Sequence, residues 1–313
     1  MNRRLLGLAA SLVCVTASPV FAQAPPTPPL VLTLPSSART SAVGNAWVAG
    51  RDAEVVFYNP AQLIGGRQEF GATVSRPGRA GTGISLASAY AGGRYSLTFG
   101  WGVRLLAFDV DAAAPYPYAS DVLLTRGDAG GNSGLLTFGG AFVFKNFRIG
   151  GAGKYVFDHV VTPPAALLPV SIDQRAWLAD VGVARTVFGG TAAFAAQNLG
   201  RTTAKTSSTL ITPRQFVAGY SWSRPAGPLD FGLYGQVTMR KDWIAPAGGV
   251  EATYSWIEGY SFTLRAGAMR PDTASEMPIA IGAGFTADRL TLEFALRFFD
   301  GGQTGSMVTV RWR

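Results

Sequence analysis

The segment from Arg289 to Phe299 alternates between apolar and polar side chains, and this pattern constrains the fold more than any other feature. Successive side chains of a β-strand point to opposite sides, so the segment predicts a strand with one apolar and one charged face. The pattern recurs over 93–108 and 259–270. Strands of soluble sandwiches alternate too, but they average about five or six residues, whereas membrane strands need about nine to eleven. The length of these segments favours membrane strands.

Fourteen such segments are expected, joined by connections that are alternately tight and long. They span approximately 68–76, 82–91, 93–108, 134–145, 147–158, 173–187, 189–198, 214–224, 229–240, 246–257, 259–270, 278–287, 288–299 and 304–313. The one departure is 224–229, a moderately long connection where a tight turn is expected. Bacterial outer-membrane barrels have even strand numbers, short periplasmic turns and longer outer loops. We therefore predict an all-β fold, a 14-stranded antiparallel transmembrane β-barrel in the outer membrane of a Gram-negative-type (diderm) bacterium.

Composition agrees with a barrel and argues against other classes. Glycine is abundant at 39 residues, charged residues make up only 15%, and mean hydropathy is positive. A closed barrel lets so apolar a chain satisfy its backbone groups in a bilayer without a membrane helix. The formal charge of +8 falls to +6 if Arg3 and Arg4 are removed with an export signal. The arginines are scattered singly along strands, which argues against nucleic-acid binding.

The first residues predict export. Basic residues at 3–4 precede an apolar run over 5–15, and 20–22 supply the small residues that signal peptidase recognises. We therefore expect a signal peptide over 1–22. The apolar run is too short for a transmembrane anchor, which crosses roughly 30 Å, and Cys14 lacks the preceding small residue that lipid attachment prefers. Cys14 is the sole cysteine, so the exported chain would have neither disulfides nor thiol chemistry.

Between the signal and the barrel lie segments that a barrel does not need. Residues 23–36 contain a run of prolines that predicts a stiff, extended linker. Residues 37–66 predict a compact plug or hatch, and 67–313 the barrel itself. A plug is favoured over a periplasmic tail because a fourteen-stranded barrel is wider than its own lumenal side chains can fill.

The plug segment Ser37–Leu63 resembles the N-terminal signature of the FadL superfamily and, more closely, its PorV/PorQ branch. An Ala-Arg start, a Gly-x-Ala pair, a Val-Ala, an acidic spacer and Asn-Pro-Ala-x-Leu follow at that spacing, and Gln197–Gly200 and Thr212–Gln215 are also similar. Asn45 and Gln62 depart from it. The resemblance implies a fourteen-stranded barrel with an N-terminal plug. The even strand count predicts that the N-terminus is periplasmic. The plug motif comprises Gly44, Ala46, Asn59, Pro60, Ala61 and Leu63.

The polar strand faces predict a polar lumen rather than a catalytic centre. Its candidate lining residues are Arg94, Arg104, Arg265, Arg289, Glu293 and Arg297. The sole histidine, His159, is expected to be exposed on an outer loop. Arg148–Tyr155 superficially resembles a phosphate loop but lacks its first glycine. Arg126–Asp128 is expected to be solvated loop rather than a calcium or cell-surface site. We expect no enzyme activity, metal or cofactor.

Two functions remain open at this stage. PorV-like proteins dock secretion partners or cargo in type IX secretion, and the closer motif agreement favours this role. FadL-like proteins passively transport hydrophobic, fatty-acid-like molecules, and the plug with an apolar loop at 167–168 favours that alternative. A purely structural or enzymatic barrel is third. Expected partners are outer-membrane lipids, the barrel-assembly machinery during insertion, and either secretion components with their cargo or hydrophobic small molecules.

Overall fold

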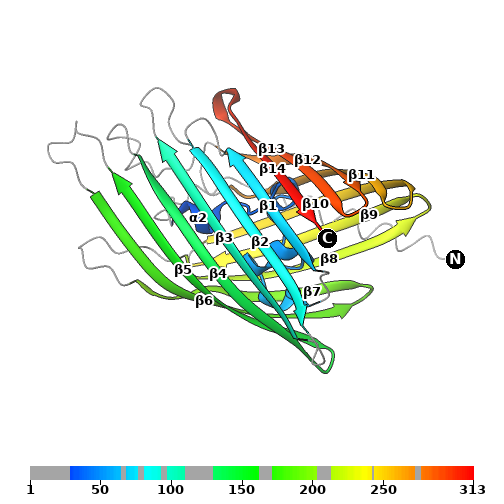
Figure 1. The fold of residues 1–313 in the computed structure, drawn as a ribbon, viewed down its shortest axis with the longest axis horizontal. Coiled ribbons are helices and arrows are strands. Elements are labelled where there is room, and N and C mark those ends of the chain that lie inside the picture. The colour runs from blue at the N-terminus through cyan, green and yellow to red at the C-terminus, as the bar shows by residue number, and fades with distance from the viewer. Residues whose placement is uncertain are drawn as a thin grey trace.

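Fourteen strands form one closed antiparallel barrel, in which β1 pairs with β14 (Figure 1). The computed structural model describes residues 29–64, 68–76, 81–92, 97–109, 130–161, 171–202, 213–241, 243–271 and 276–313. The strands are β1 (Glu69–Arg76), β2 (Gly81–Gly92), β3 (Leu97–Asp109), β4 (Gly130–Phe144), β5 (Phe147–Val161), β6 (Ser171–Val187), β7 (Gly190–Thr202), β8 (Gln215–Ala226), β9 (Leu229–Arg240), β10 (Trp243–Ile257), β11 (Tyr260–Met269), β12 (Glu276–Ala287), β13 (Leu290–Phe299) and β14 (Thr304–Trp312). The predicted fold class is confirmed.

The two faces of the strands separate as the alternation predicts. On β13, Leu290, Leu292 and Phe294 are exposed on the outside, whereas Glu293 and Arg297 are buried inside. Exposed large apolar side chains recur on strands all around the barrel. An outer apolar surface with a polar interior is the inverse of a soluble protein and fits a bilayer surrounding the barrel.

The connections differ from the expectation in two places. β8 ends at Ala226 and β9 begins at Leu229, so the moderately long connection expected over 224–229 is wrong. Gly227 permits this tight turn because its φ is 70°, which glycine adopts without a Cβ clash. At the opposite end β5 and β7 continue beyond their expected ends, to Val161 and Thr202. The turns at 145–146, 188–189, 227–228, 258–259 and 288–289 therefore lie at the same end of the barrel as the C-terminus, whereas the short connection between β9 and β10 lies at the opposite end.

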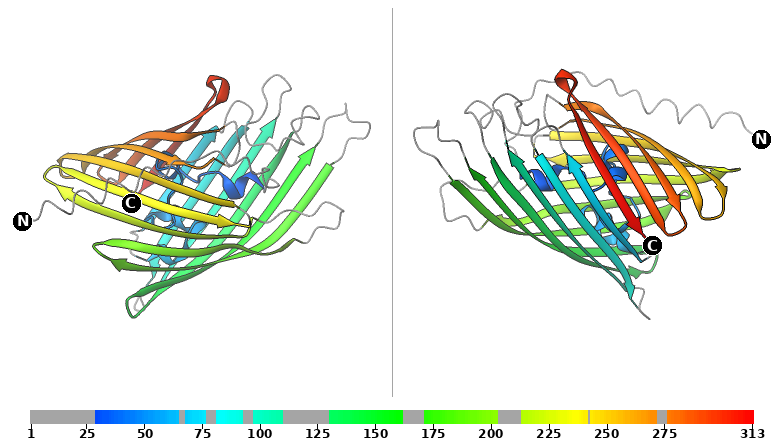
Figure 2. Two further views of the ribbon diagram at one scale, coloured as in Figure 1. Left: turned by 180° about the vertical axis from the view of Figure 1, so that it is seen from behind. Right: turned by 45° about the horizontal axis from the view of Figure 1, so that its top comes forward.

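The segment before β1 lies inside the barrel (Figures 1 and 2). It comprises α2 (Leu30–Thr33), α3 (Ala38–Ala42), η1 (Ala53–Phe57) and η2 (Pro60–Leu63), and we call residues 29–64 the insert. Its apolar side chains, including Val43, Trp47 and Val56, form the principal buried cluster together with inward residues of the wall. The lumen therefore has a packed core, which a barrel of this width needs for rigidity.

The insert begins earlier than the sequence suggests. Residues 23–36 were expected to form an extended linker, but the described part of that range includes helix α2 and buried Val31 and Leu34. Val31 belongs to the cluster inside the barrel and Leu32 packs against it, so the burial of this segment overrides the preference of the neighbouring prolines for extended backbone. The expected signal peptide lies outside the described residues and stays a prediction, as do the other segment boundaries.

Candidate functional site

Glycines on the lumenal face of the wall let the insert approach at backbone distance. A Cβ added at Gly150 would lie 2.4 Å from the amide nitrogen of Ala61, and one at Gly267 would lie 2.2 Å from that of Gly44. Neither space is compatible with a side chain. Much of the abundant glycine thus serves the seat of the insert rather than turns.

The plug motif comes together at this seat. Asn59 caps η2, its Oδ1 accepting from the amide of Ala61 at 3.1 Å, while its Nδ2 donates to the carbonyl of Val48 at 3.0 Å. Pro60 occupies the first turn of η2, where its missing N–H costs nothing. Gly44 has φ 67° and lies against the backbone of Ala268. The remaining motif residues Ala46, Ala61 and Leu63 are all buried.

Arg311 of β14 is the centre of a buried charge network that sequence analysis missed. It is 1% exposed and lies 3.1 to 3.4 Å from four carboxylates. Two belong to the insert and two to the wall: Asp52, Glu54, Glu69 and Glu293. The position was visible in the sequence, because it alternates with the outward residues of 306–312, but its partners were not.

The carboxyl group of Glu54 is unusual within this network. Burial raises its pKa well above the ordinary value of 4.5, and the neighbouring carboxylates raise it further, although Arg311 opposes the shift. Arg311 is the guanidinium that all four acids share, and burial in a medium of low polarity disfavours each charge. Protonation of Glu54 is therefore favoured when the insert is in place.

The predicted lumenal residues on β11 to β13 extend the network. Arg265 pairs with Glu251 at 2.5 Å and with Glu293 at 2.9 Å. Arg39 of the insert reaches the same Glu251 at 3.0 Å. Arg297 pairs instead with Glu276 at the end of β12. These groups hold α3 against β10 to β13 through alternating charges.

Arg104 holds the start of the insert in a different way. Its guanidinium donates to three main-chain carbonyls, those of Val31, Leu34 and Pro35, at 2.8 to 2.9 Å. Carbonyls left over at the end of the short helix α2 are thereby satisfied. The residue was correctly assigned to the lumen, but its partner is backbone rather than a solute or an acid.

The other two lumenal candidates do not join the site. Arg94 lies outside the described residues. The prediction that Arg289 faces the lumen is wrong, because it is exposed in the turn between β12 and β13, where its carbonyl accepts from the amide of Arg313. The alternation that placed it inside ends one residue later, at the first residue of the strand.

A further missed cluster surrounds Lys154 of β5. Its ammonium group lies 2.5 Å from Asp180 and also donates to the carbonyl of Phe57 in the insert. Asp180 lies at a shift in the β6–β7 register and accepts from the amide of Asn198, which has φ 57°. Lys154 falls within the stretch that resembles a phosphate loop, and the structure places that stretch in a strand.

His159 was expected in a loop, and this is wrong. It lies in β5, is partly exposed, and its Nδ1 is 2.6 Å from Asp173 of β6.

In the part of the chain that the structure describes, no group of three or more histidine, cysteine or acidic residues could hold a metal ion. None of the described helices is long and apolar enough to cross a membrane. Residues 126–128 and 167–168 lie outside the described ranges.

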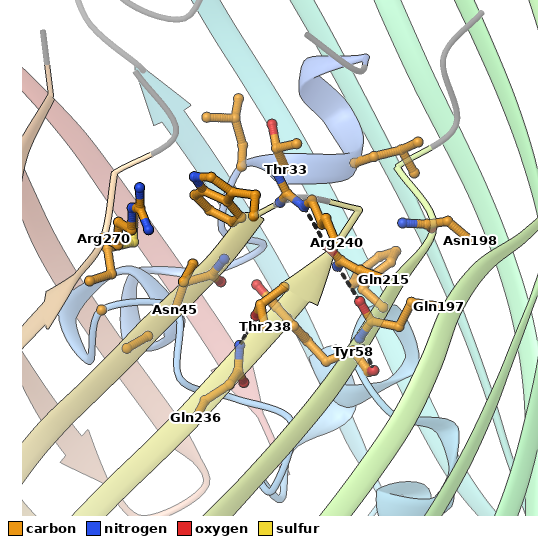
Figure 3. Close-up of a pocket in the computed structure, with 18 of the residues that line it drawn as sticks. Thr33, Asn45, Tyr58, Gln197, Asn198, Gln215, Gln236, Thr238, Arg240 and Arg270 are labelled. Carbon is orange, nitrogen blue, oxygen red and sulfur yellow. Dashed lines mark hydrogen bonds between the residues drawn. The ribbon is translucent and has the colours of Figure 1, made fainter. Parts of the chain in front are cut away.

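A cavity lies between the insert and the wall, lined by residues of β3 to β5 and β7 to β11, at the end opposite the tight turns (Figure 3). The space in it that water-sized molecules can occupy is about 70 Å³ and is open to solvent. Hydrogen bonds link Tyr58, Gln197, Gln215 and Arg240 along one side of it, the Arg240 contact being 2.9 Å. An apolar part is contributed by Leu32, Leu34, Leu135, Trp243 and Met269.

The described lining of the cavity includes the basic residues Arg104, Lys154, Arg240 and Arg270 and no acidic residue. Lys154 pairs with Asp180. Arg240 and Arg270 lie over the ring of Trp243, 4.7 and 5.6 Å from its centroid. An aromatic face flanked by two guanidinium groups accommodates an apolar body with an electronegative end.

The fold is a closed barrel of fourteen strands with an N-terminal segment in the lumen, and it is similar to the fold of solved FadL-like barrels. Similar solved structures include the toluene transporter TbuX of Ralstonia pickettii, with a TM-score of 0.59, 12% identity and coverage of 88% of this chain and 98% of that one. The toluene transporter TodX of Pseudomonas putida gives 0.56, 8%, 87% and 95%. A Pseudomonas aeruginosa FadL homologue gives 0.55, 10%, 89% and 98%.

At these identities the likeness concerns the fold. No protein-family model matches the chain, and no curated protein matches it. None of the three solved structures is described as a PorV or PorQ protein. The FadL-like architecture is therefore established, whereas the PorV/PorQ branch expected from the motif is not.

Proposed function

We propose that this chain is a passive outer-membrane transporter of hydrophobic small molecules that carry a polar or anionic end, such as fatty-acid-like solutes. The observation that carries the proposal is the cavity between the insert and the wall, whose described lining joins an apolar part to basic and polar side chains. Two of the three solved structures named above are described as toluene transporters, which supports a hydrophobic cargo for this fold.

The cavity supports entry from the end that carries the long connections. Arg240, Trp243 and Arg270 lie at the ends of β9, β10 and β11 on that side. Their guanidinium groups would orient the polar end of a solute while the apolar part contacts Trp243 and Leu34. The insert, packed below, would block direct flow until it shifts. In this arrangement the N-terminus is periplasmic and the bilayer lipids contact the outer apolar surface.

Uptake into liposomes tests the proposal. Reconstituted protein is expected to bind and pass hexadecanoate, and Arg240→Gln with Arg270→Gln is expected to weaken binding by about tenfold or more, since charge-assisted hydrogen bonds are worth roughly 1.5–3 kcal/mol. Arg224→Gln, at the exposed tight-turn end, is the matched control and is expected to change nothing. Protein that neither binds nor passes long-chain apolar solutes would refute transport.

Docking of secretion partners or cargo, as in type IX secretion, is the competing function. The motif resemblance favours it, but the solved structures similar to this chain favour transport. Affinity capture from solubilised outer membranes separates the two, because a docking protein is expected to retain a secretion component or cargo. A non-enzymatic role and insertion by the barrel-assembly machinery belong to either proposal.

A further inference from the structure

Two arginines meet at the end of the lumen that carries the tight turns, far from the cavity. Arg51 belongs to the insert, between Gly50 and η1, and Arg148 is the second residue of β5. Both donate to one oxygen, Oγ1 of Thr191 near the start of β7, at 2.8 Å and 3.3 Å. The hydroxyl itself is fully buried, while Arg51 is exposed. An insert side chain and a wall side chain thus converge on a single acceptor.

This pair lacks the acidic partners that several other arginines of the lumen have. Arg39, Arg265 and Arg297 each pair with a carboxylate. Among the described residues, no carboxylate lies within ion-pair distance of Arg51 or Arg148.

Two like charges that share one neutral acceptor repel each other. An anion between the two guanidinium groups relieves this repulsion. Each guanidinium presents five N–H donors and uses only one of them on Thr191, so donors remain for the anion. Guanidinium forks match the oxygens of carboxylates and phosphates in particular. Access is open on the side of Arg51, and Ser221 fixes the adjoining insert backbone by donating to the carbonyl of Ala49 at 2.9 Å.

We propose that Arg51, Arg148 and Thr191 form a binding site for a single oxyanion, a phosphate or carboxylate group, which fastens the insert to the barrel wall. The anion bridges the insert to β5, so its binding stabilises the seated insert, and its departure loosens the 47–52 segment. The site is independent of the transport cavity, which lies at the other end of the barrel. The site recognises only the oxyanion group of its ligand, whether this group belongs to a free ion or to a lipid headgroup.

Cysteine accessibility provides the test. Val48 is 1% exposed and lies beside this segment, so a Val48→Cys change in a Cys14→Ser chain reports when the insert opens. In vesicles of neutral phosphatidylcholine, inorganic phosphate is expected to slow maleimide labelling several-fold relative to chloride at equal ionic strength. Arg51→Gln and Arg148→Gln are each expected to abolish this protection. A heat-modifiable gel shift checks that each variant has a folded barrel.

Arg185→Gln is the matched control, because Arg185 is exposed at the same end and lies over the ring of Phe147 rather than in the pair. It is expected to retain full protection by phosphate. Vesicles containing phosphatidylglycerol separate the two sources, since a lipid headgroup protects without added phosphate and a free anion does not. Equal labelling in phosphate and chloride together with no protection by phosphatidylglycerol, or protection that survives Arg148→Gln, overturns the proposal.

Discussion

The two sides of the insert are held in place by different mixtures of contacts. On one side α3 contacts β11 to β14 and η1 contacts β1, and the buried charges around Arg311 and Glu251, which we call the charged seat, act together with close backbone approach at Gly267. On the other side η2 lies on β4, β5 and β6 through the inward glycines and the amide of Asn59, which we call the glycine seat. Charges tolerate small displacements but respond to protonation. Backbone contacts at glycines tolerate almost no displacement and ignore pH.

The comparison suggests that the two seats can be loosened separately. Two buried positions report on them, Val43 beside the charged seat and Val48 beside the glycine seat. Each is replaced by cysteine, one at a time, in the Cys14→Ser chain, and maleimide labelling rates are compared. A perturbation of one seat is expected to expose its own reporter first.

The largest effect is expected from Arg311→Gln. It removes the one guanidinium shared by Asp52, Glu54, Glu69 and Glu293, and a buried ion pair that loses one partner costs about 3–5 kcal/mol. Labelling at the charged seat is therefore expected to rise roughly a hundredfold or more.

Arg313→Gln is the control for this change, because Arg313 contacts only Glu69 of this group and is 39% exposed in its side chain. It is expected to have a small effect. Similar labelling in the Arg311 variant and the unchanged chain would mean that the network does not hold the insert.

A somewhat smaller effect is expected from Gly150→Ala at the glycine seat. The added methyl group meets backbone atoms of Pro60 and Ala61 at 2.4 to 2.5 Å, and such overpacking costs about 1–3 kcal/mol. The reporter at Val48 should respond more than that at Val43. Gly153→Ala, three residues along β5, has nothing within 4 Å and serves as the control. If both alanine variants behave alike, close approach is not what the glycine provides.

Asn59→Ala should cost about 1 kcal/mol, the usual value for losing a side chain that caps a helix. The change also removes the hydrogen bond to the carbonyl of Val48. Thermal release of the insert, followed by protease cleavage near residue 50, measures the loss. Asn59→Asp keeps the accepting oxygen but not the donor, so an intermediate loss of stability is expected. If this variant keeps the full stability, the hydrogen bond to Val48 does not contribute.

The smallest effect is a pH dependence confined to the charged seat. The raised pKa of Glu54 means that the seated insert binds this proton more tightly than the released one. Protonation of Glu54 therefore stabilises the seated insert increasingly as the pH falls through the raised pKa, and this stabilisation is complete below the ordinary pKa of 4.5. Labelling at Val43 is expected to slow over this window, and Glu54→Gln should flatten the response. If the labelling rate of the Glu54 variant depends on pH as steeply as that of the unchanged chain, the pH dependence comes from other groups.

Much of the fold was predictable because it follows from local alternation. The pattern over 289–299 correctly indicated which side chains face lipid and which face the lumen, and the count of fourteen followed from repeating it. The prediction for Arg289 was wrong because alternation does not show where a strand ends and a turn begins. The insert was recognisable from Asn59-Pro60-Ala61, yet burial of Val31 and Leu34 extended it into the expected linker.

The sequence by itself determined a two-faced, glycine-rich chain that closes into a barrel around its own N-terminal segment. Only the tertiary structure decided which charges meet. Arg311 and Glu54 are 257 residues apart, and they are joined because β14 closes on β1 around the seated insert. A period of two fixes the face of a strand but carries no information about a partner across the lumen, since that depends on closure, register and the position of the insert together.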